Sequence, residues 1–406
     1  MRMLDGGMLR ARERGEQKVT PLELFFDLVY VYAITQLSHL LLGHPTVGGA
    51  LETLFLLLVV WWAWQYTAWF TNWFDPEALP VRLMLVAVML ASLVMSVAIP
   101  GAFGERGLMF ALAFVTIQVG RTGFAVVALA GSPGASDRTS RDLAMTFRRI
   151  LCWFAASGVL WVAGGLLEGG ARYALWMLAL AVDYAGPVAH YRTPLLGRSR
   201  TEEWTIEGGH FAERCQLFVI IALGESILVT GTTFGEVEAS VATVAAFAVA
   251  FVGSAALWWT YFARSARDAS ETIARSEDPG RIARSAYTYF HLPIIAGIIA
   301  VAASDELTVA HPGDPGTFAS VSLTLGGAAL FVTGHGFFVW KISGRIPWSR
   351  LGVVVALAAL VPLGFAVPTL ALAVTAALVV VALAAWDSAT YLGRRRWRES
   401  GPGRRL

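Results

Sequence analysis

The chain has 406 residues, of which 56% are hydrophobic and only 15% are charged. Soluble domains contain about 25% charged residues, and apolar runs of membrane-spanning length recur here from one end to the other. This composition excludes an ordinary soluble protein, and the lack of alternating apolar segments of about ten residues excludes a transmembrane β-barrel. We therefore predict an all-α fold, an integral membrane helical bundle. The net charge of +2 gives no indication of a partner.

The first apolar run, Pro21 to Leu42, carries the most informative polar residues. As a helix it would rise about 33 Å, enough to cross the hydrocarbon core of a bilayer. Glu23 and Asp27 are four residues apart and share one helix face, whereas Gln36 points to the opposite side. Ionisable groups at membrane depth face a bundle interior, a partner or water, so we expect Asp27 near the functional centre. Glu23 has a second interpretation, because acidic residues also stabilise helix starts.

About twelve transmembrane spans are predicted along the chain. Three prolines inside spans, Pro187, Pro293 and Pro362, predict kinks or local irregularity. The predicted spans are 21–42, 48–71, 82–99, 107–130, 147–167, 172–191, 210–230, 240–263, 284–303, 317–340, 350–366 and 369–391.

Basic residues give the orientation of these spans. All but four of the 31 Lys and Arg lie in the N-terminal tail, the C-terminal tail, or the even-numbered loops and the span ends beside them. Cytoplasmic segments are the ones enriched in Lys and Arg, so both termini are predicted to be cytoplasmic. The predicted organisation is a cytoplasmic tail at 1–19, one membrane domain at 20–392 and a basic cytoplasmic tail at 393–406. Because 1–19 has no apolar core, the first span is expected to direct insertion.

The two halves of the membrane domain, 20–192 and 208–392, show weak similarity to each other. A shift of 189 residues places Ala33 on Ala222 and aligns several of the residues that follow. Two parallel six-helix repeats, related by an axis along the membrane normal, would produce such a match, as in some transporter families. Chance agreement between apolar helices is the alternative interpretation.

The seventh predicted span holds the densest set of polar residues. His210, Arg214 and Glu225 share one helix face, and Glu213 lies beside it. Lipid would not tolerate this stripe, so it should face the bundle interior or a cavity. We expect Arg214 to pair with one of the two carboxylates of the first span. His210 and Glu213 also have the spacing of a metal pair, but the single copy favours a polar network, and we predict neither a metal nor a cofactor.

Three further spans contain buried polar candidates. Gln118 and Arg121 lie on one face of the fourth span, and Asp183 lies in the sixth. Arg121 is expected near mid-membrane, where it needs an acidic partner, for which Asp183 and Glu225 are the candidates. His291, in the ninth span, is expected to be a satisfied hydrogen-bonding residue, with a proton relay as the less favoured alternative.

Four stretches of the chain share their pattern with one family: VTPLELFFDLVYVYAITQLS, HFAERCQLFVIIALGESILVTG, LWWTYF and YFHLPIIAGIIAVAASDE. The chain resembles the bacterial low-temperature-requirement A (LtrA) family from about Val19 to the twelfth span. This resemblance implies a multi-pass protein of the bacterial cytoplasmic (inner) membrane. It implies no catalytic residues, but it directs attention to the polar residues of the matching stretches, which are Glu23, Asp27, Gln36, His210, Glu213, Arg214, Glu225 and His291.

The lack of nucleotide and hydrolase motifs narrows the function. The sequence has no GxxxxGKS/T, GxSxG, HExxH or CxxC pattern, so direct use of ATP is not expected. The preferred hypothesis is a gradient-driven transporter or channel, coupled to an ion or proton through a buried acid–base network. The alternatives are a membrane-embedded enzyme acting on a lipid or another apolar substrate and a structural or sensory membrane protein. The expected partners are membrane lipids and an unidentified small solute or ion, and nucleic acid is not expected. The sequence indicates neither catalytic residues nor an oligomeric state.

Overall fold

The chain folds into α-helices joined by short connections. The computed structural model describes residues 7–10, 18–131, 138–199, 206–263, 269, 272–273 and 282–400, without the side chains of 138–139, 283–284 and 391–400. Within these residues there are no β-strands, only isolated bridges. The fold has two compact units, unit 1 (Met1–Arg214 with Ser276–Ala283) and unit 2 (Cys215–Arg275 with Arg284–Leu406). The predicted all-α membrane bundle is confirmed.

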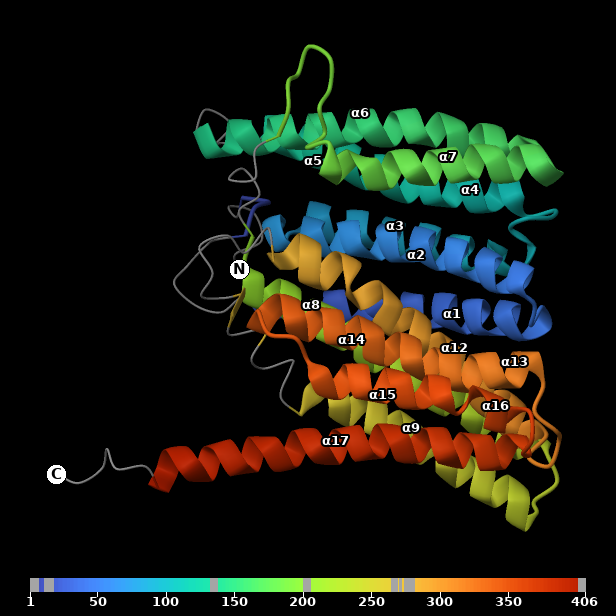
Figure 1. Cartoon of the computed structure of the whole chain (residues 1–406). Helices are drawn as coiled ribbons and strands as arrows, with labels where there is room; N and C mark the ends of the chain where they lie inside the picture. Colours follow the sequence, from blue (N-terminus) through green and yellow to red (C-terminus); the bar gives the residue numbers. More distant parts are fainter. Residues whose placement is uncertain are drawn as a thin grey trace. The chain divides into compact units, whose positions relative to one another are not determined.

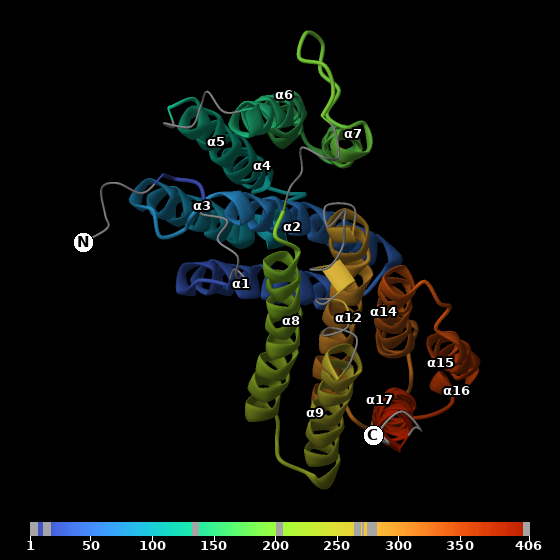
Figure 2. The same ribbon diagram turned by 90° about the vertical axis from the view of Figure 1, so that its left-hand side faces the viewer.

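Unit 1 contains the first helices of the chain. They are α1 (Pro21–Gly43), α2 (Val47–Trp73), α3 (Leu79–Ala98), η1 (Ile99–Gly101), α4 (Gly107–Val115), the π-helical segment η2 (Thr116–Gly120), α5 (Arg121–Ala130), α6 (Arg138–Leu166), α7 (Gly169–Val188) and the start of α8 (Gly208–Glu236). In both views α2 and α3 lie between α1 and the group formed by α4 to α7 (Figures 1 and 2). Direct contacts join α1 to both α2 and α3, and α4 to α6.

Helix α1 begins at a capping box. The Thr20 side chain accepts a hydrogen bond from the backbone N–H of Glu23, and the Glu23 carboxylate accepts one from the backbone N–H of Thr20. Pro21 occupies the first turn, where a missing N–H removes no helical hydrogen bond. The cap therefore fixes the position of Glu23 at the start of a membrane-spanning helix.

Unit 2 contains the rest of α8 and the later helices. They are α9 (Val241–Phe262), α12 (His291–Ala310), α13 (Phe318–Val321), the π-helical segment η5 (Ser322–Gly326), α14 (Gly327–Ser343), α15 (Trp348–Ala359), α16 (Val361–Gly364) and α17 (Thr369–Ser400). A further π-helical segment, η4 (Ala283–Tyr289), precedes α12. Within this unit α12 contacts α9 and α14, while α17 contacts α9 and α15 (Figure 2).

Helices α12 and α14 approach each other closely at glycines. A Cβ atom added at Gly297 would lie only 2.8 Å from the carbonyl oxygen of Gly327, and one at Gly334 would lie 2.9 Å from the backbone nitrogen of Ile294. Such spacing leaves no room for a side chain. Small residues at these positions allow two membrane helices to pack backbone against backbone.

Ten helices in the described residues are long and apolar enough to cross a membrane, rather than the twelve predicted. All twelve predicted spans coincide with helical segments, but two fall short of that criterion. Helix α7 is long enough, yet it carries Arg172 and Asp183 among its apolar residues. The eleventh predicted span is interrupted, because α15 has 12 residues and a separate short helix, α16, starts at Val361. Pro362 stands at this interruption, as the sequence predicted.

The outer surface of the helices is apolar along much of their length. Many of the exposed large side chains are aliphatic residues of the predicted spans, including Leu83, Leu90, Val127, Val159 and Leu178. Several charged side chains of the membrane-spanning helices, including Asp27, Arg121 and Asp183, are instead buried. This arrangement suits a lipid environment, in which polar groups turn inward.

Candidate functional site

Buried charged residues of α1 and α8 form a cluster within unit 1. We call it the charged cluster, and its core consists of Glu23, Asp27, His210 and Arg214. All four side chains are fully buried, with 0% exposure. The predicted pairing of Arg214 with the carboxylates of the first span is therefore confirmed.

Arg214 bridges the two carboxylates of α1. Its Nη1 lies 3.1 Å from Oε1 of Glu23, and its Nη2 donates to Oδ1 of Asp27 at 2.5 Å. The two carboxylates are one helical turn apart, so a planar guanidinium can reach both at once. This geometry offsets part of the cost of burying three charges.

Aromatic rings enclose the bridge. The guanidinium carbon of Arg214 lies 5.7 Å from the ring centroids of both Phe26 and Trp64. Trp64 also donates its indole N–H to Oδ1 of Asp27 at 2.8 Å. The other carboxylate oxygen of Asp27, Oδ2, is buried and has no hydrogen-bond partner among the described residues. It is the one carboxylate oxygen of the charged cluster that can take up a proton or a cation without losing an existing partner.

Glu23 combines two tasks that the sequence presented as alternatives. It caps α1, and it is also the most connected acid of the charged cluster. Its Oε2 accepts from Nη2 of Arg10 at 2.9 Å, and its Oε1 lies 3.0 Å from Nε2 of His210. Two arginines and two carboxylates thus balance each other, while His210 connects them to α8.

The hydrogen bonds around His210 assign its tautomer. The side-chain amide of Asn72 is held by the backbone of Glu207, donating to the carbonyl at 2.9 Å and accepting from the N–H at 2.8 Å. Its NH₂ group therefore faces Nδ1 of His210, 3.2 Å away. Nδ1 must accept that hydrogen bond, so the proton of the neutral ring lies on Nε2, which is 3.0 Å from Oε1 of Glu23. A second proton on the ring would require the Asn72 amide to move.

Glu207 positions His210 in turn. Its carboxylate accepts from the backbone N–H groups of Gly209, at 3.1 Å, and His210, at the start of α8. A carboxylate at this position satisfies free N–H groups of the first turn and interacts favourably with the helix dipole. The same residue therefore fixes both the start of α8 and the orientation of Asn72.

Three predicted site residues lie apart from the core of the charged cluster. Glu213 is exposed, and its carboxylate accepts only a long hydrogen bond, 3.4 Å, from the backbone N–H of Val19. Because His210 faces Glu23 instead, the structure does not bring His210 and Glu213 together as a metal pair. Gln36 is half-buried farther along α1, and Glu225 is buried in unit 2.

Among the described residues of unit 1, Arg121 has no acidic partner, so the predicted pairing with Asp183 is wrong. Its guanidinium donates to the Gln118 side chain at 2.5 Å, to the Thr67 hydroxyl at 2.9 Å and to the carbonyl of Ala63 at 3.3 Å. Asp183, the proposed partner, accepts instead from Ser157 and from the indole of Trp161. Neutral dipoles therefore solvate both buried charges, a possibility that residue spacing does not reveal.

His291 belongs to an aromatic cluster in unit 2. Its Nε2 lies 2.6 Å from the hydroxyl of Tyr261, and its Nδ1 lies 3.1 Å from the carbonyl of Ala286. Since the carbonyl can only accept, Nδ1 carries the proton and Nε2 accepts from the tyrosine. His291 is thus hydrogen-bonded on both sides, as expected. His335, on α14, is buried without a hydrogen-bond partner for either ring nitrogen among the described residues.

Sequence reasoning missed several contributors to the charged cluster. Asn72 and Trp64 lie in the aromatic-rich second half of α2, and Arg10 lies in the predicted tail. A single amide inside an apolar run is a signal that could have identified Asn72, because a buried amide needs partners. Arg10 has no comparable signal, since basic tails ordinarily set topology.

The fold and the charged cluster define a multi-pass helical membrane protein with ionised side chains buried among its helices. The chain belongs to the family of the bacterial low temperature requirement A protein (LtrA), whose model matches residues 18–385. The uncharacterized protein RA0937 of Rhizobium meliloti (strain 1021) is 36% identical over 394 residues, which cover 97% of this chain and 93% of that protein. No solved structure matches the chain. The resemblance seen in the four stretches is confirmed.

Proposed function

We propose that the protein is a gradient-driven transporter or channel of the bacterial cytoplasmic membrane, in which the charged cluster responds to an ion or proton. The observation that supports it most is the complete burial of Glu23, Asp27, His210 and Arg214 in membrane-spanning helices. Ionisable residues at such depth are costly and usually mark ion or substrate pathways. With both termini cytoplasmic, as the distribution of basic residues predicts, the charged cluster lies toward the cytoplasmic side.

The chemistry of the charged cluster supports this proposal. Its fixed charges are balanced, because Arg10 and Arg214 face Glu23 and Asp27. One added proton or cation would therefore create a net charge in a low-dielectric surrounding, where electrostatic interactions are strong. Such a change can shift an equilibrium between two conformations, which is what coupling to a gradient requires. The unpartnered Oδ2 of Asp27 is the group positioned to receive it.

Flux through reconstituted protein tests the proposal. Purified full-length chain is placed in liposomes with an internal pH-sensitive dye, and ion or pH gradients are imposed across panels of cations and solutes. We expect a protein-dependent flux that Asp27→Asn lowers by roughly tenfold or more, the effect of about 1.4 kcal/mol on a rate-limiting step. Glu52→Gln is the matched control, because it neutralises a carboxylate of α2 that bonds to Tyr173 outside the charged cluster.

Two outcomes would contradict the proposal that the charged cluster couples transport to an ion or proton. The first is no flux across the whole panel from protein that unfolds cooperatively on heating. The second is a flux that Asp27→Asn leaves unchanged. If variants of the charged cluster lower only the amount of folded protein, its role is structural, as in buried ion pairs that stabilise a fold once formed.

A further inference from the structure

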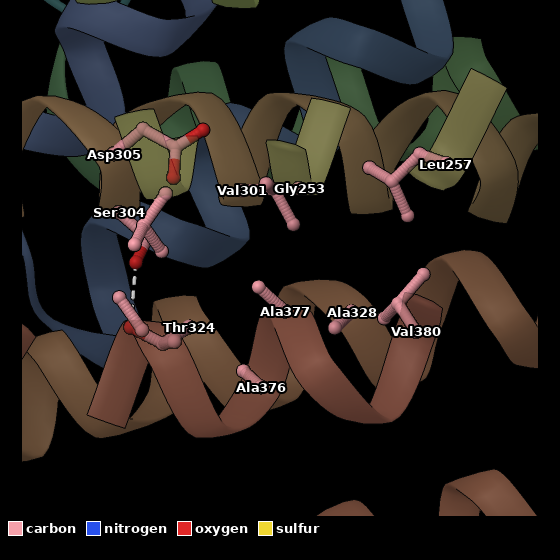
Figure 3. Close-up of a pocket in the computed structure, with 12 residues that line it drawn as sticks. Gly253, Leu257, Val301, Ser304, Asp305, Thr324, Ala328, Ala376, Ala377 and Val380 are labelled. Atoms are coloured by element: carbon pink, nitrogen blue, oxygen red, sulfur yellow. Dashed lines mark hydrogen bonds between the residues drawn. The ribbon is translucent and has the colours of Figure 1, made fainter. Parts of the chain in front are cut away.

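Unit 2 contains a cavity that is separate from the charged cluster. It lies between α9, α12, η5–α14 and α17 and has a volume of about 40 Å³. A single water molecule needs only about 10–15 Å³ of such space, so the cavity has room for a small ion. Figure 3 shows Asp305, Ser304 and Thr324 together at one end, whereas Leu257 and Val380 line the other.

Asp305 is an acid without a counter-charge. Its side chain lies on α12 and is 92% buried, with 8% exposure. Its Oδ2 is 3.4 Å from the hydroxyl of Ser226, which in turn lies 3.1 Å from the hydroxyl of Ser254. Oδ1 has no hydrogen-bond partner in the described part of the chain, and no Lys, Arg or His there forms an ion pair with this residue. An isolated carboxylate buried among apolar helices is strongly destabilised unless a proton or a bound cation neutralises it.

Neutral oxygen atoms stand beside this carboxylate. The hydroxyl of Ser304, adjacent to Asp305 in sequence, lies 2.5 Å from the hydroxyl of Thr324. Thr324 belongs to the π-helical segment η5, and π-helical segments are frequent at functional sites because they redirect a side chain. The rest of the lining consists of small and aliphatic residues, which leave the space open and supply no further charge.

We propose that this cavity binds one alkali cation of about the size of sodium, with Asp305 supplying the negative charge and Ser304 and Thr324 supplying neutral ligands. Hard cations prefer oxygen ligands, and backbone or side-chain oxygens replace their hydration shell in selective sites. One carboxylate neutralises one monovalent ion, whereas a divalent ion would leave a net charge in an apolar environment. The site deepens the proposed function by naming the ion, and for its physiological role it rests on that function. Binding itself is measurable without flux.

Equilibrium binding of radioactive sodium to the purified full chain in detergent tests the site. Wild-type protein should bind sodium saturably, about one ion per chain, with competition by lithium chloride but not by choline chloride. Asp305→Asn should weaken binding by roughly tenfold or more. Thr324→Val keeps the carboxylate and should weaken binding by roughly twofold to tenfold, the range for a lost neutral hydrogen-bonding group. Glu306→Gln, which alters the adjacent carboxylate that does not line the cavity, should bind like wild type.

Three results would overturn the site. Wild-type protein that unfolds cooperatively but shows no saturable sodium binding is one, and Asp305→Asn protein with unchanged affinity is another. The third is evidence that Asp305 carries a proton instead of binding the ion. That evidence would be an infrared carboxylic-acid band that is absent from Asp305→Asn protein but persists in wild type at saturating sodium. If Asp27→Asn protein loses flux but still binds sodium, the sodium site is supported independently of the charged cluster. A failure of one proposal can therefore be told apart from a failure of the other.

Discussion

Arg214 is the cation that both carboxylates of α1 share, which makes it the sharpest test at the scale of single residues. We expect Arg214→Ala to lower the free energy of unfolding by about 3–5 kcal/mol, because it leaves Glu23 and Asp27 buried without their shared cation. Arg214→Lys should also be destabilising, since an ammonium group cannot reproduce the planar fork that reaches both carboxylates. Thermal unfolding in detergent measures both effects.

The control for this prediction is the neighbouring residue. Glu213→Ala removes an exposed side chain with one long hydrogen bond, so it should stay within about 0.5 kcal/mol of wild type. If Arg214→Lys protein is as stable as wild type, the planar fork of the guanidinium contributes little to stability.

Two tryptophans of α2 allow the contribution of a hydrogen bond to stability to be measured separately from that of ring packing. Trp64 and Trp62 are both about 1% exposed or less, but the indole N–H of Trp64 bonds to Asp27 while that of Trp62 has no hydrogen-bond partner in the described residues. Trp64→Phe should therefore cost about 1–3 kcal/mol more stability than Trp62→Phe, because a buried charged acceptor loses its donor. Equal losses in thermal unfolding would mean that the hydrogen bond contributes little.

Part of the charged cluster was predictable from residue chemistry alone. A guanidinium in an apolar helix needs a partner, and two carboxylates one turn apart in the first span supplied it, so the pairing of Arg214 was foreseeable. The same logic offered Asp183 as a partner for Arg121, which was wrong, because amide, hydroxyl and carbonyl groups can also solvate a buried cation. Asp305 was missed because only tertiary packing reveals a cavity beside it.

At the scale of helices, the approach of α12 to α14 depends on glycine. A Cβ at Gly297 would overlap the backbone of α14, lying 2.8 Å from the carbonyl oxygen of Gly327. Gly297→Ala should therefore destabilise the protein by about 1–3 kcal/mol, the usual range for overpacking. Gly352→Ala on α15 is the control, since nothing lies within 4 Å of its added Cβ. A helical alanine there should be neutral or slightly stabilising, and equal behaviour of the two variants in thermal unfolding would contradict the close packing.

Helix positions were largely predictable, and their interruptions were not. Every span predicted from an apolar run coincides with a helical segment, because the hydropathy of a segment depends on its composition alone. The break beside Pro362 was foreseeable from the missing N–H of proline. The π-helical segments η2 and η5 have no such marker, since an extra residue in one turn is selected by packing against neighbours.

At the scale of the whole molecule, contacts inside the two units favour the predicted duplication. The second helix contacts the sixth in both units: α2 meets α7 where Tyr184 bonds to the carbonyl of Leu58, and α9 meets α17 where Trp259 bonds to Ser388. The third contacts the fourth in both, through α3–α4 and α12–α14. The fourth helix contains a π-helical segment in each unit. We therefore propose that 20–192 and 208–392 are parallel repeats, as in several transporter families.

Parallel repeats require an even number of spans per half, which predicts the side of the membrane on which each connection lies. With both termini cytoplasmic, the connection between α3 and α4 is outside and the connection between α14 and α15 is inside. In protein whose native Cys152 and Cys215 are replaced by alanine, Glu105→Cys should react with a membrane-impermeant maleimide in intact cells, whereas Arg345→Cys should react only after permeabilisation. Both positions are exposed, so accessibility to reagent depends on the side of the membrane. Labelling of Arg345→Cys but not Glu105→Cys in intact cells would reverse the orientation. Labelling of both positions there would mean an even number of crossings between them, which parallel six-helix repeats do not allow.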